Sequence, residues 1–194
     1  MKRDIILSGV GGQGILTIAT IIGSAALEEG LYLKQAEVHG MSQRGGDVQS
    51  NLRIADRPVV SDLIPTGTAD LIISLEPMEA LRYLPMLSAG GWVVTNTVPF
   101  VNIDNYPAEA ELQAALAALP HAITLDVDAL AREAASPRSS NIVLLGAAAP
   151  LLGLEPEALE EGIRRIFARK GEAVVNANLE AFRAGFRHAK TCTA

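Results

Sequence analysis

Cysteine is almost absent from this chain. Cys192 is the only cysteine among 194 residues, which excludes an internal disulfide, a cysteine-ligated iron–sulfur cluster and a cysteine-based zinc site. Aromatic residues make up only 4% of the chain, so the core has to be built from Ala, Leu, Ile and Val. That mixture suits helices packed against a mostly parallel sheet.

Positive charge and long apolar runs are also scarce. The 16 basic and 22 acidic residues give a net charge of -6, so we expect neither a nucleic-acid partner nor a membrane partner. Polar groups between Gly23 and Glu29 interrupt the longest apolar stretch, which is therefore too short to span a bilayer. The N-terminus reaches its first glycine-rich loop too soon to be a signal peptide. We expect a cytoplasmic protein.

Glycine, in contrast, is concentrated near the N-terminus, first in a loop between a strand-like run (4–8) and a helical stretch. The candidate contact residues of this loop are Gly9, Gly11, Gly12, Gln13 and Gly14. Glycines at its first, third and sixth positions let the chain turn sharply out of a sheet and aim free backbone N–H groups at an anion. The amide of Gln13 could donate to a ligand or a partner. The alternative is a tight turn whose glycines only allow close packing.

A second loop, residues 40–46, gathers hydrogen-bond donors beside a histidine. Its candidate contact residues are His39, Ser42, Gln43, Arg44, Gly45 and Gly46. The guanidinium group of Arg44 is a fork of donors suited to phosphate or carboxylate, and neighbouring glycines allow a close approach. We expect this loop to contact a ligand or another subunit, the alternative being a solvated irregular loop. We predict no catalytic residue in this chain, because His39 has no serine–acid companions in the pattern. We predict no metal ligand either: Asp126 and Asp128 could suggest a metal, but Asp128 is better explained as an N-cap.

Glu37 provides the basis for an alternative function. It lies about 20 residues beyond the first loop, where a dinucleotide-binding fold keeps its ribose-binding acid. The alternative is therefore a free-standing Rossmann-like nucleotide-binding protein or dehydrogenase, and a third possibility is an interaction module without a ligand. Against the first alternative, residues 47–54 alternate as a half-exposed strand, antiparallel or at an edge, which a dinucleotide domain does not have at this place.

The order of elements predicts an α/β fold: a three-layer, Rossmann-like, mostly parallel sheet with flanking helices and a helical C-terminal part. Strands are predicted at 4–8, 31–36, 47–54, 71–75, 92–95 and 122–125, and helices at 15–29, 77–87, 108–119, 128–135, 141–152, 156–168 and 172–188. Asp128 is the expected N-cap of its helix, and Pro150 could end the next helix early. Residues 139–141 cap that helix and would contact a ligand if its end faces the glycine loops. We expect one domain over residues 1–190 and a frayed tail over 191–194.

Five segments carry a resemblance to a known family, namely residues 9–17, 37–46, 61–65, 76–84 and 141–147. They resemble the gamma-type component of the 2-oxoacid:ferredoxin oxidoreductases, and within that group the subunits of the enzymes that act on indolepyruvate. The similarity covers nearly the whole chain. The segment 37–46 is the most specific, because related subunits for other oxoacids usually have a different sequence there.

The resemblance implies a function. It implies the smaller, cofactor-free subunit of a complex that oxidatively decarboxylates indolepyruvate and other arylpyruvates to aryl-acetyl-CoA and reduces ferredoxin. Thiamine diphosphate and iron–sulfur clusters would then lie on a larger alpha subunit, with coenzyme A as co-substrate, and this chain alone would be inactive. The matching loops would contact that subunit near its active site, and possible contacts include the phosphates of coenzyme A. The apolar surface of the first helix would be covered partly by the same partner.

Overall fold

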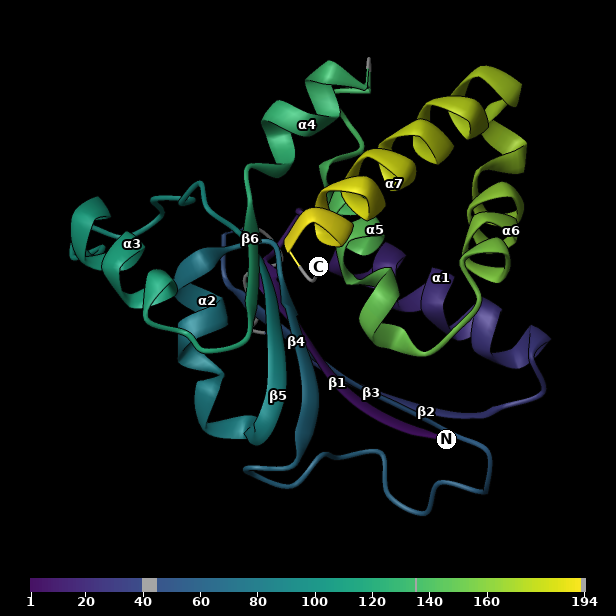
Figure 1. Cartoon of the computed structure of the whole chain (residues 1–194), viewed down its shortest axis with the longest axis horizontal. Coiled ribbons are helices and arrows are strands. Elements are labelled where there is room, and N and C mark those ends of the chain that lie inside the picture. The colour runs from purple at the N-terminus through teal and green to yellow at the C-terminus, as the bar shows by residue number, and fades with distance from the viewer. Residues whose placement is uncertain (40–44, 135, 193–194) are drawn as a thin grey trace.

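The computed structural model describes residues 1–39, 45–134 and 136–192. Six strands form one sheet in the order β2-β3-β1-β4-β5-β6, with helices on both faces (Figure 1). The strands are β1 (Lys2–Val10), β2 (Tyr32–His39), β3 (Asp47–Ala55), β4 (Ala69–Ser74), β5 (Leu87–Asn96) and β6 (Ala122–Leu125). The predicted three-layer α/β architecture is confirmed.

The sheet is mostly parallel, with one reversed strand. The pairs β1–β4, β4–β5 and β5–β6 are parallel, whereas β3 is antiparallel to both β1 and β2. The strand at 47–54, predicted to be antiparallel or at an edge, is thus antiparallel, and β2 forms the edge of the sheet. The expected exposure of its polar face is wrong around Asn51, whose Oδ1 accepts a hydrogen bond of 3.2 Å from the Ile64 N–H. The chain after β3 folds back across that face and covers it.

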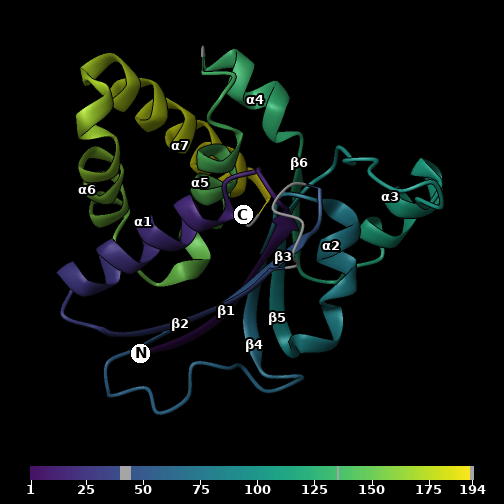
Figure 2. The same cartoon turned by 180° about the vertical axis from the view of Figure 1, so that it is seen from behind.

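The larger helical layer packs on one face of the sheet (Figures 1 and 2). It contains α1 (Ile15–Glu28), α4 (Val127–Glu133), α5 (Ser140–Leu152), α6 (Pro156–Phe167) and α7 (Glu172–Cys192), with the short η2 (Ala168–Lys170) between the last two. Gly162 of α6 approaches Ile21 closely, so the chain's own α6 covers much of the apolar surface of α1. The expectation that a partner covers part of this surface stays a prediction for the remainder. None of the described helices is both long and apolar enough to cross a membrane.

The opposite face of the sheet carries the smaller layer. It consists of α2 (Pro77–Arg82), η1 (Leu84–Met86) and α3 (Glu109–Ala117). Ile6, Ile72 and Val93 from three neighbouring strands form its core together with Ala80 of α2. The sheet is thus buried on both faces, as a largely parallel sheet requires.

Three local expectations need correction. Asp126, not Asp128, is the N-cap of α4, and its carboxylate accepts from the Ala129 N–H at 2.8 Å. Helix α5 continues through Pro150 to Leu152, because a proline in the last turn removes a single hydrogen bond and its ring is on the exposed side. Helix α7 continues to Cys192, two residues into the segment expected to be frayed.

Candidate functional site

The two glycine-rich loops meet at the edge of the sheet where β1 ends. The antiparallel ladder between β1 and β3 runs as far as the pair Val10 and Asp47. Beyond it, the Gly11 N–H donates to the Gly46 carbonyl at 2.9 Å, and the Gly45 N–H donates to the Gly11 carbonyl at 3.4 Å. The structure therefore brings part of the two predicted sets of residues together. Ser42, Gln43 and Arg44 lie outside the described residues.

The first loop has the backbone that its glycines predict. Gly12 and Gly14 have φ values of 102° and 90°, in the left-handed region that residues with a Cβ disfavour. Gln13 serves the loop itself, since its Oε1 accepts from the Val10 N–H at 2.7 Å and its Nε2 donates to the Leu75 carbonyl at 3.4 Å. An outside ligand would have to compete with these bonds for the Gln13 amide.

Glu37 lies away from the first loop. It pairs with Ser50 of β3, and Ser50 pairs with Leu7 of β1. Adjacent strands are about 4.8 Å apart, so the backbone of Glu37 is roughly 10 Å from β1. In a dinucleotide fold the ribose-binding acid ends the strand next to the glycine loop. The inserted strand β3 removes this arrangement and weakens the dinucleotide-binding alternative. His39 ends the same edge strand, paired with Val48.

The N-terminal end of α5 does face the first loop. Asn141 Nδ2 donates to the Gly14 carbonyl at 3.2 Å, which joins the start of α5 to the start of α1. A cavity of about 220 Å³ beside this junction is lined by residues that include Gln13, Asn96, Asp128 and Arg138. Residues 139–141 were expected to contact a ligand if the start of α5 faces the glycine loops. The start of α5 does face the first loop, and Asn141 is the residue that contacts it.

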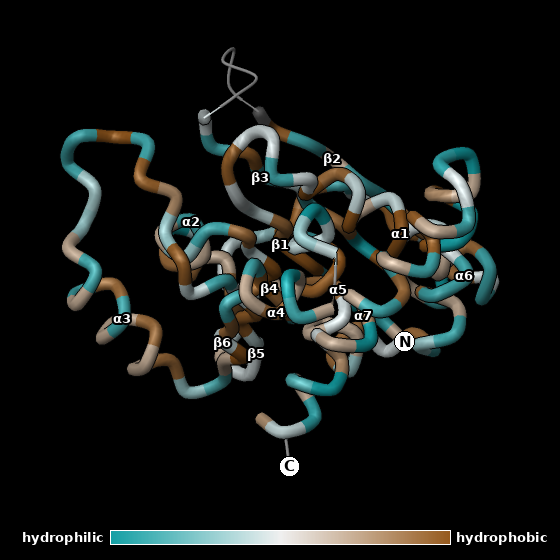
Figure 3. The backbone as a smooth tube through the Cα atoms, turned by 90° about the horizontal axis from the view of Figure 1, so that it is seen from above, coloured by the Kyte–Doolittle hydropathy of each residue, from teal (hydrophilic) through white to brown (hydrophobic). Residues whose placement is uncertain are grey.

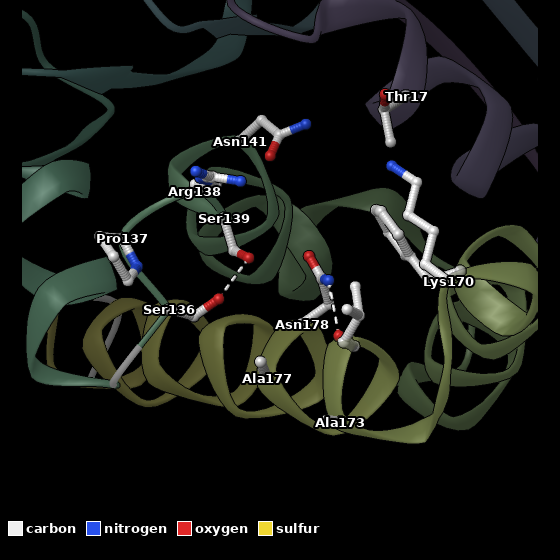
Figure 4. A pocket seen from close by; sticks show the side chains of 12 residues that line it. Thr17, Ser136, Pro137, Arg138, Ser139, Asn141, Lys170, Ala173, Ala177 and Asn178 are labelled. Atoms are coloured by element: carbon white, nitrogen blue, oxygen red, sulfur yellow. Dashed lines mark hydrogen bonds between the residues drawn. The ribbon is translucent and has the colours of Figure 1, made fainter.

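A larger cavity of about 620 Å³ adjoins the first one and shares Arg138 and Asn141 with it. In Figure 4, Arg138 lies beside Asn141 on one side, and Lys170 lies near Thr17 on the other. Within the part of the chain that the structure describes, neither cation has a carboxylate at ion-pair distance; the Lys170 ammonium group lies over the Phe167 ring at 5.2 Å. Two cations without an acidic partner, next to two helix N-termini, can attract an anionic group.

Pattern reasoning missed a buried carboxyl group at the same edge of the sheet. Glu76 follows β4, is fully buried and caps α2 by accepting from the Glu79 N–H at 2.9 Å. The Phe100 N–H donates to the same carboxyl group at 3.2 Å. The Tyr106 hydroxyl also donates to it. Burial and this bond to Glu76 raise the pKa of Tyr106. The available signal was an acidic residue directly before a proline at the first helical position.

A second acidic group fixes the start of β3. The Tyr83 hydroxyl donates to Asp47 Oδ2 at 2.7 Å, and burial together with this bond raises the pKa of Tyr83. Glu79 lies nearby and pairs with Arg82 at 2.7 Å. Burial raises the pKa of the Glu79 carboxyl, and Asp47 adds to the increase while Arg82 opposes it. These contacts fix Asp47, the residue that directly follows the second glycine loop.

The described residues contain no grouping of side chains that fits a metal ion, and the cysteine count does not fit an iron–sulfur cluster. Across residues 1–39, 45–134 and 136–192, no three His, Cys, Asp or Glu side chains are grouped so that they could hold a metal ion. An iron–sulfur cluster needs several cysteine ligands, and the chain has one, in the last turn of α7.

Comparison with known proteins identifies the family. Residues 4–188 match the family model described as pyruvate ferredoxin/flavodoxin oxidoreductase. The chain belongs to this family. The indolepyruvate oxidoreductase subunit IorB of Pyrococcus horikoshii is 39% identical over 97% of this chain and 96% of that protein. The subunit of the same name from Methanothermobacter thermautotrophicus is 37% identical over 96% of this chain and 97% of its own.

Solved structures of the family share the fold. The gamma subunit of a keto/oxoacid ferredoxin oxidoreductase from Geobacter sulfurreducens superposes with a TM-score of 0.70 at 25% identity, covering 97% of this chain and 99% of that one. The 2-oxoglutarate:ferredoxin oxidoreductase from Magnetococcus marinus, solved with coenzyme A bound, has a TM-score of 0.76 at 24% identity. The aligned region covers 98% of this chain and 31% of the longer chain. The chain is therefore a small, gamma-type subunit of a 2-oxoacid:ferredoxin oxidoreductase, as the sequence indicated.

Proposed function

We propose that this chain is the smaller, cofactor-free subunit of an enzyme that oxidatively decarboxylates indolepyruvate and other arylpyruvates in the cytoplasm. The observation that carries the substrate class is the ranking of relatives. Subunits named for indolepyruvate are 37% to 39% identical over nearly the full length, whereas a common gamma subunit of pyruvate and ketoisovalerate oxidoreductases is 31% identical.

The reaction divides naturally between two subunits. The bond between the keto carbon and the carboxylate breaks, carbon dioxide leaves, the acyl group joins the coenzyme A sulfur as a thioester, and the electron pair passes to ferredoxin. We assign thiamine diphosphate and the iron–sulfur clusters to a larger alpha subunit, because this chain has one cysteine and no pattern typical of a thiamine site. The role that remains for this chain is to contact coenzyme A and the larger subunit.

Two features support a contact with coenzyme A near the glycine loops. The first loop places the N-terminus of α1, which has no acidic residue in its first turn, at this edge of the sheet. The adjoining cavities add Arg138 and Lys170. Helix N-termini and unpaired cations bind phosphate groups, of which coenzyme A has several.

The segment between β5 and α3, residues 97–107, supports a contact with the larger subunit. It exposes four apolar side chains, namely Val98 (40%), Phe100 (47%), Val101 (68%) and Ile103 (42%). Figure 3 shows the loop that leads to α3 projecting to one side of the sheet, with brown parts between teal ones. It also touches the second glycine loop, since Asn102 Nδ2 donates to the Gly45 carbonyl at 2.6 Å. Apolar side chains gathered in one exposed loop are typical of a protein–protein contact.

Reconstitution tests the proposal. The chain and a cysteine-rich larger subunit, mixed without oxygen, should reduce a viologen dye in the presence of indolepyruvate and coenzyme A, while this chain alone should not. Indolepyruvate should give a higher kcat/KM than pyruvate or 2-oxoglutarate. A preference for either of the latter would contradict the substrate class. Calorimetric titration of the isolated chain with NADH tests the dehydrogenase alternative, which tight binding would support.

Arg44 offers a second test of the loop. Arg44→Ala should lower kcat/KM of the assembled enzyme about tenfold, because a charge-assisted hydrogen bond is lost. The melting temperature of the isolated chain should stay unchanged, since a loop arginine contributes little to a core. Arg57→Ala, an exposed arginine after β3, is the matched control and should change neither quantity. If Arg44→Ala unfolds the isolated chain, Arg44 is structural and its assignment to a contact surface is wrong.

A further inference from the structure

Glu76 is a fully buried carboxyl group without a basic partner among the described residues. Burying a carboxyl group is costly unless hydrogen bonds satisfy its oxygens. Here three donors do so: the Glu79 N–H bonds to Oε2, and the Phe100 N–H and the Tyr106 hydroxyl bond to Oε1. Helix capping alone would use only the first of these donors and would leave the group at the surface.

The donors come from two separate segments. The Glu79 N–H belongs to the first turn of α2, which follows β4, while Phe100 and Tyr106 belong to segment 97–107, which follows β5. Since β4 and β5 are parallel neighbours, Glu76 links the helix after the first of these strands to the loop after the second. Asn96 holds only the start of the segment, through bonds to Val98 at 3.1 and 3.3 Å.

Segment 97–107 is also hydrogen-bonded to the second glycine loop. Asn102, between the two residues that Glu76 holds, donates to the Gly45 carbonyl at 2.6 Å. Gly45 and Gly46 in turn bond to Gly11. Hydrogen bonds joined by the backbone of segment 97–107 therefore connect the Glu76 carboxyl group with both glycine loops, and the exposed apolar side chains lie on that same segment.

We propose that Glu76 is a positioning residue: through Phe100 and Tyr106 it fixes segment 97–107, and thereby presents Gly45 and the apolar side chains to the larger subunit. The first half of the proposal, that Glu76 fixes the segment, concerns the isolated chain. The second half, that the segment presents a surface to the larger subunit, rests on the proposed function.

Tyr106→Phe is the decisive variant, because it removes one hydroxyl group and leaves the bond from the Glu79 N–H to Glu76 in place. Glu76→Gln is less selective. A carboxamide has a single accepting oxygen, so either Glu79 or the donors of the segment would face an NH₂ group. Tyr32→Phe is the matched control, since Tyr32 is an exposed tyrosine on the edge strand β2.

Limited chymotrypsin digestion of the isolated, folded chain tests the first half. Cleavage after Phe100 should be about tenfold faster in Tyr106→Phe than in the wild type, because a bond that closes the segment is lost. Tyr32→Phe should be cleaved at the wild-type rate. Cleavage after the buried Phe182 reports global unfolding and should not change. An unchanged rate at Phe100 would overturn the proposal, whatever the function of the protein.

A double-mutant cycle tests whether Tyr106 acts through Glu76. A hydrogen bond to a carboxylate is roughly twice as strong as one between neutral groups. Tyr106→Phe should therefore accelerate cleavage only about two- to threefold when Glu76 is already Gln. An equal acceleration in both backgrounds would mean that Tyr106 is held by something other than Glu76.

The reconstituted enzyme tests the second half. Tyr106→Phe should raise either the dissociation constant of the two subunits or the KM for coenzyme A about tenfold and leave kcat unchanged at saturation, because a displaced surface weakens binding without altering the reacting groups. Faster cleavage with both constants unchanged would refute the positioning role. If wild-type subunits do not assemble at all, the proposed function fails, and the proteolysis result still decides whether Glu76 holds the segment.

Discussion

Gly146→Ala is expected to lower the free energy of unfolding by about 3 kcal/mol or more, the largest effect of any substitution considered for this fold. A Cβ atom at position 146 would lie 1.9 Å from the Phe182 carbonyl oxygen and 3.0 Å from the Phe186 nitrogen. Both atoms belong to the backbone of α7, so no side-chain rotation relieves the overlap. Helix α7 would have to move away from α5 and uncover the core between them.

The contact is reciprocal, which makes the prediction sharper. A Cβ atom at Gly185 of α7 would lie 1.9 Å from the Val143 carbonyl oxygen of α5. The two helices thus touch backbone to backbone, each through a glycine, and Gly185→Ala should destabilise the protein by a similar amount.

Urea unfolding followed by circular dichroism measures the effect. The control is Gly90→Ala, where an added Cβ meets no atom of the described residues within 4 Å and stability should hardly change. Helix propensity alone favours Ala over Gly by about 1 kcal/mol. A stabilised Gly146→Ala variant would therefore mean that α5 and α7 are not in close contact.

This helix contact also marks the limit of what the sequence could predict. The helical pattern places both glycines inside helices and located α5 to within one residue, and the short apolar run at 122–125 located β6 without error. Such patterns arise from neighbours along the chain, so they report local structure well. Nothing local indicates that Gly146 faces Gly185, because that pairing depends on how two helices cross after the chain has folded.

The sheet shows the same limit. The sequence predicted the alternating strand at 47–54 and left open whether it is antiparallel or at an edge, but it did not predict its place between β1 and β2. That insertion moves Glu37 away from the first glycine loop and changes the meaning of a spacing that fits a dinucleotide fold. Strand order is set by long-range pairing, and a spacing motif is informative only once that order is known.

In the candidate site, the sequence indicated several residues but not the contacts between them. The sequence indicated both glycine loops, but their contact follows from the pairing of β1 with β3, which depends on the strand order. Asn141 was expected at a helix start, and its bond to Gly14 needed the fold. Glu76 and Tyr106 are 30 residues apart, and Glu76 has no local pattern beyond its place before Pro77. Buried polar partners of this kind become visible only when the donors of each carboxyl group are counted in three dimensions.

Gly14→Ala should cause the largest effect outside the contact between α5 and α7, and its comparison with Gly12→Ala isolates the cause. Both glycines have φ near +100°, so an alanine at either position carries backbone strain of roughly 1–2 kcal/mol. A Cβ at Gly12 meets no described atom within 4 Å, whereas a Cβ at Gly14 would lie 2.6 Å from Asn141 Nδ2. Gly14→Ala should therefore add the loss of the Asn141 hydrogen bond, for a total of about 2–3 kcal/mol. In the assembled enzyme it should lower kcat/KM more than Gly12→Ala does.

Removing Asn141 tests this explanation directly. All three of the nearest atoms around an added Cβ at Gly14 belong to Asn141. In an Asn141→Ala background, Gly14→Ala should therefore cost only the strain seen for Gly12→Ala, and the double-mutant cycle should show a coupling of about 1 kcal/mol. Urea unfolding of the four variants measures it. Additive effects would mean that the start of α5 does not hold the first glycine loop, and the junction between the two helix N-termini would lose its role in shaping the site.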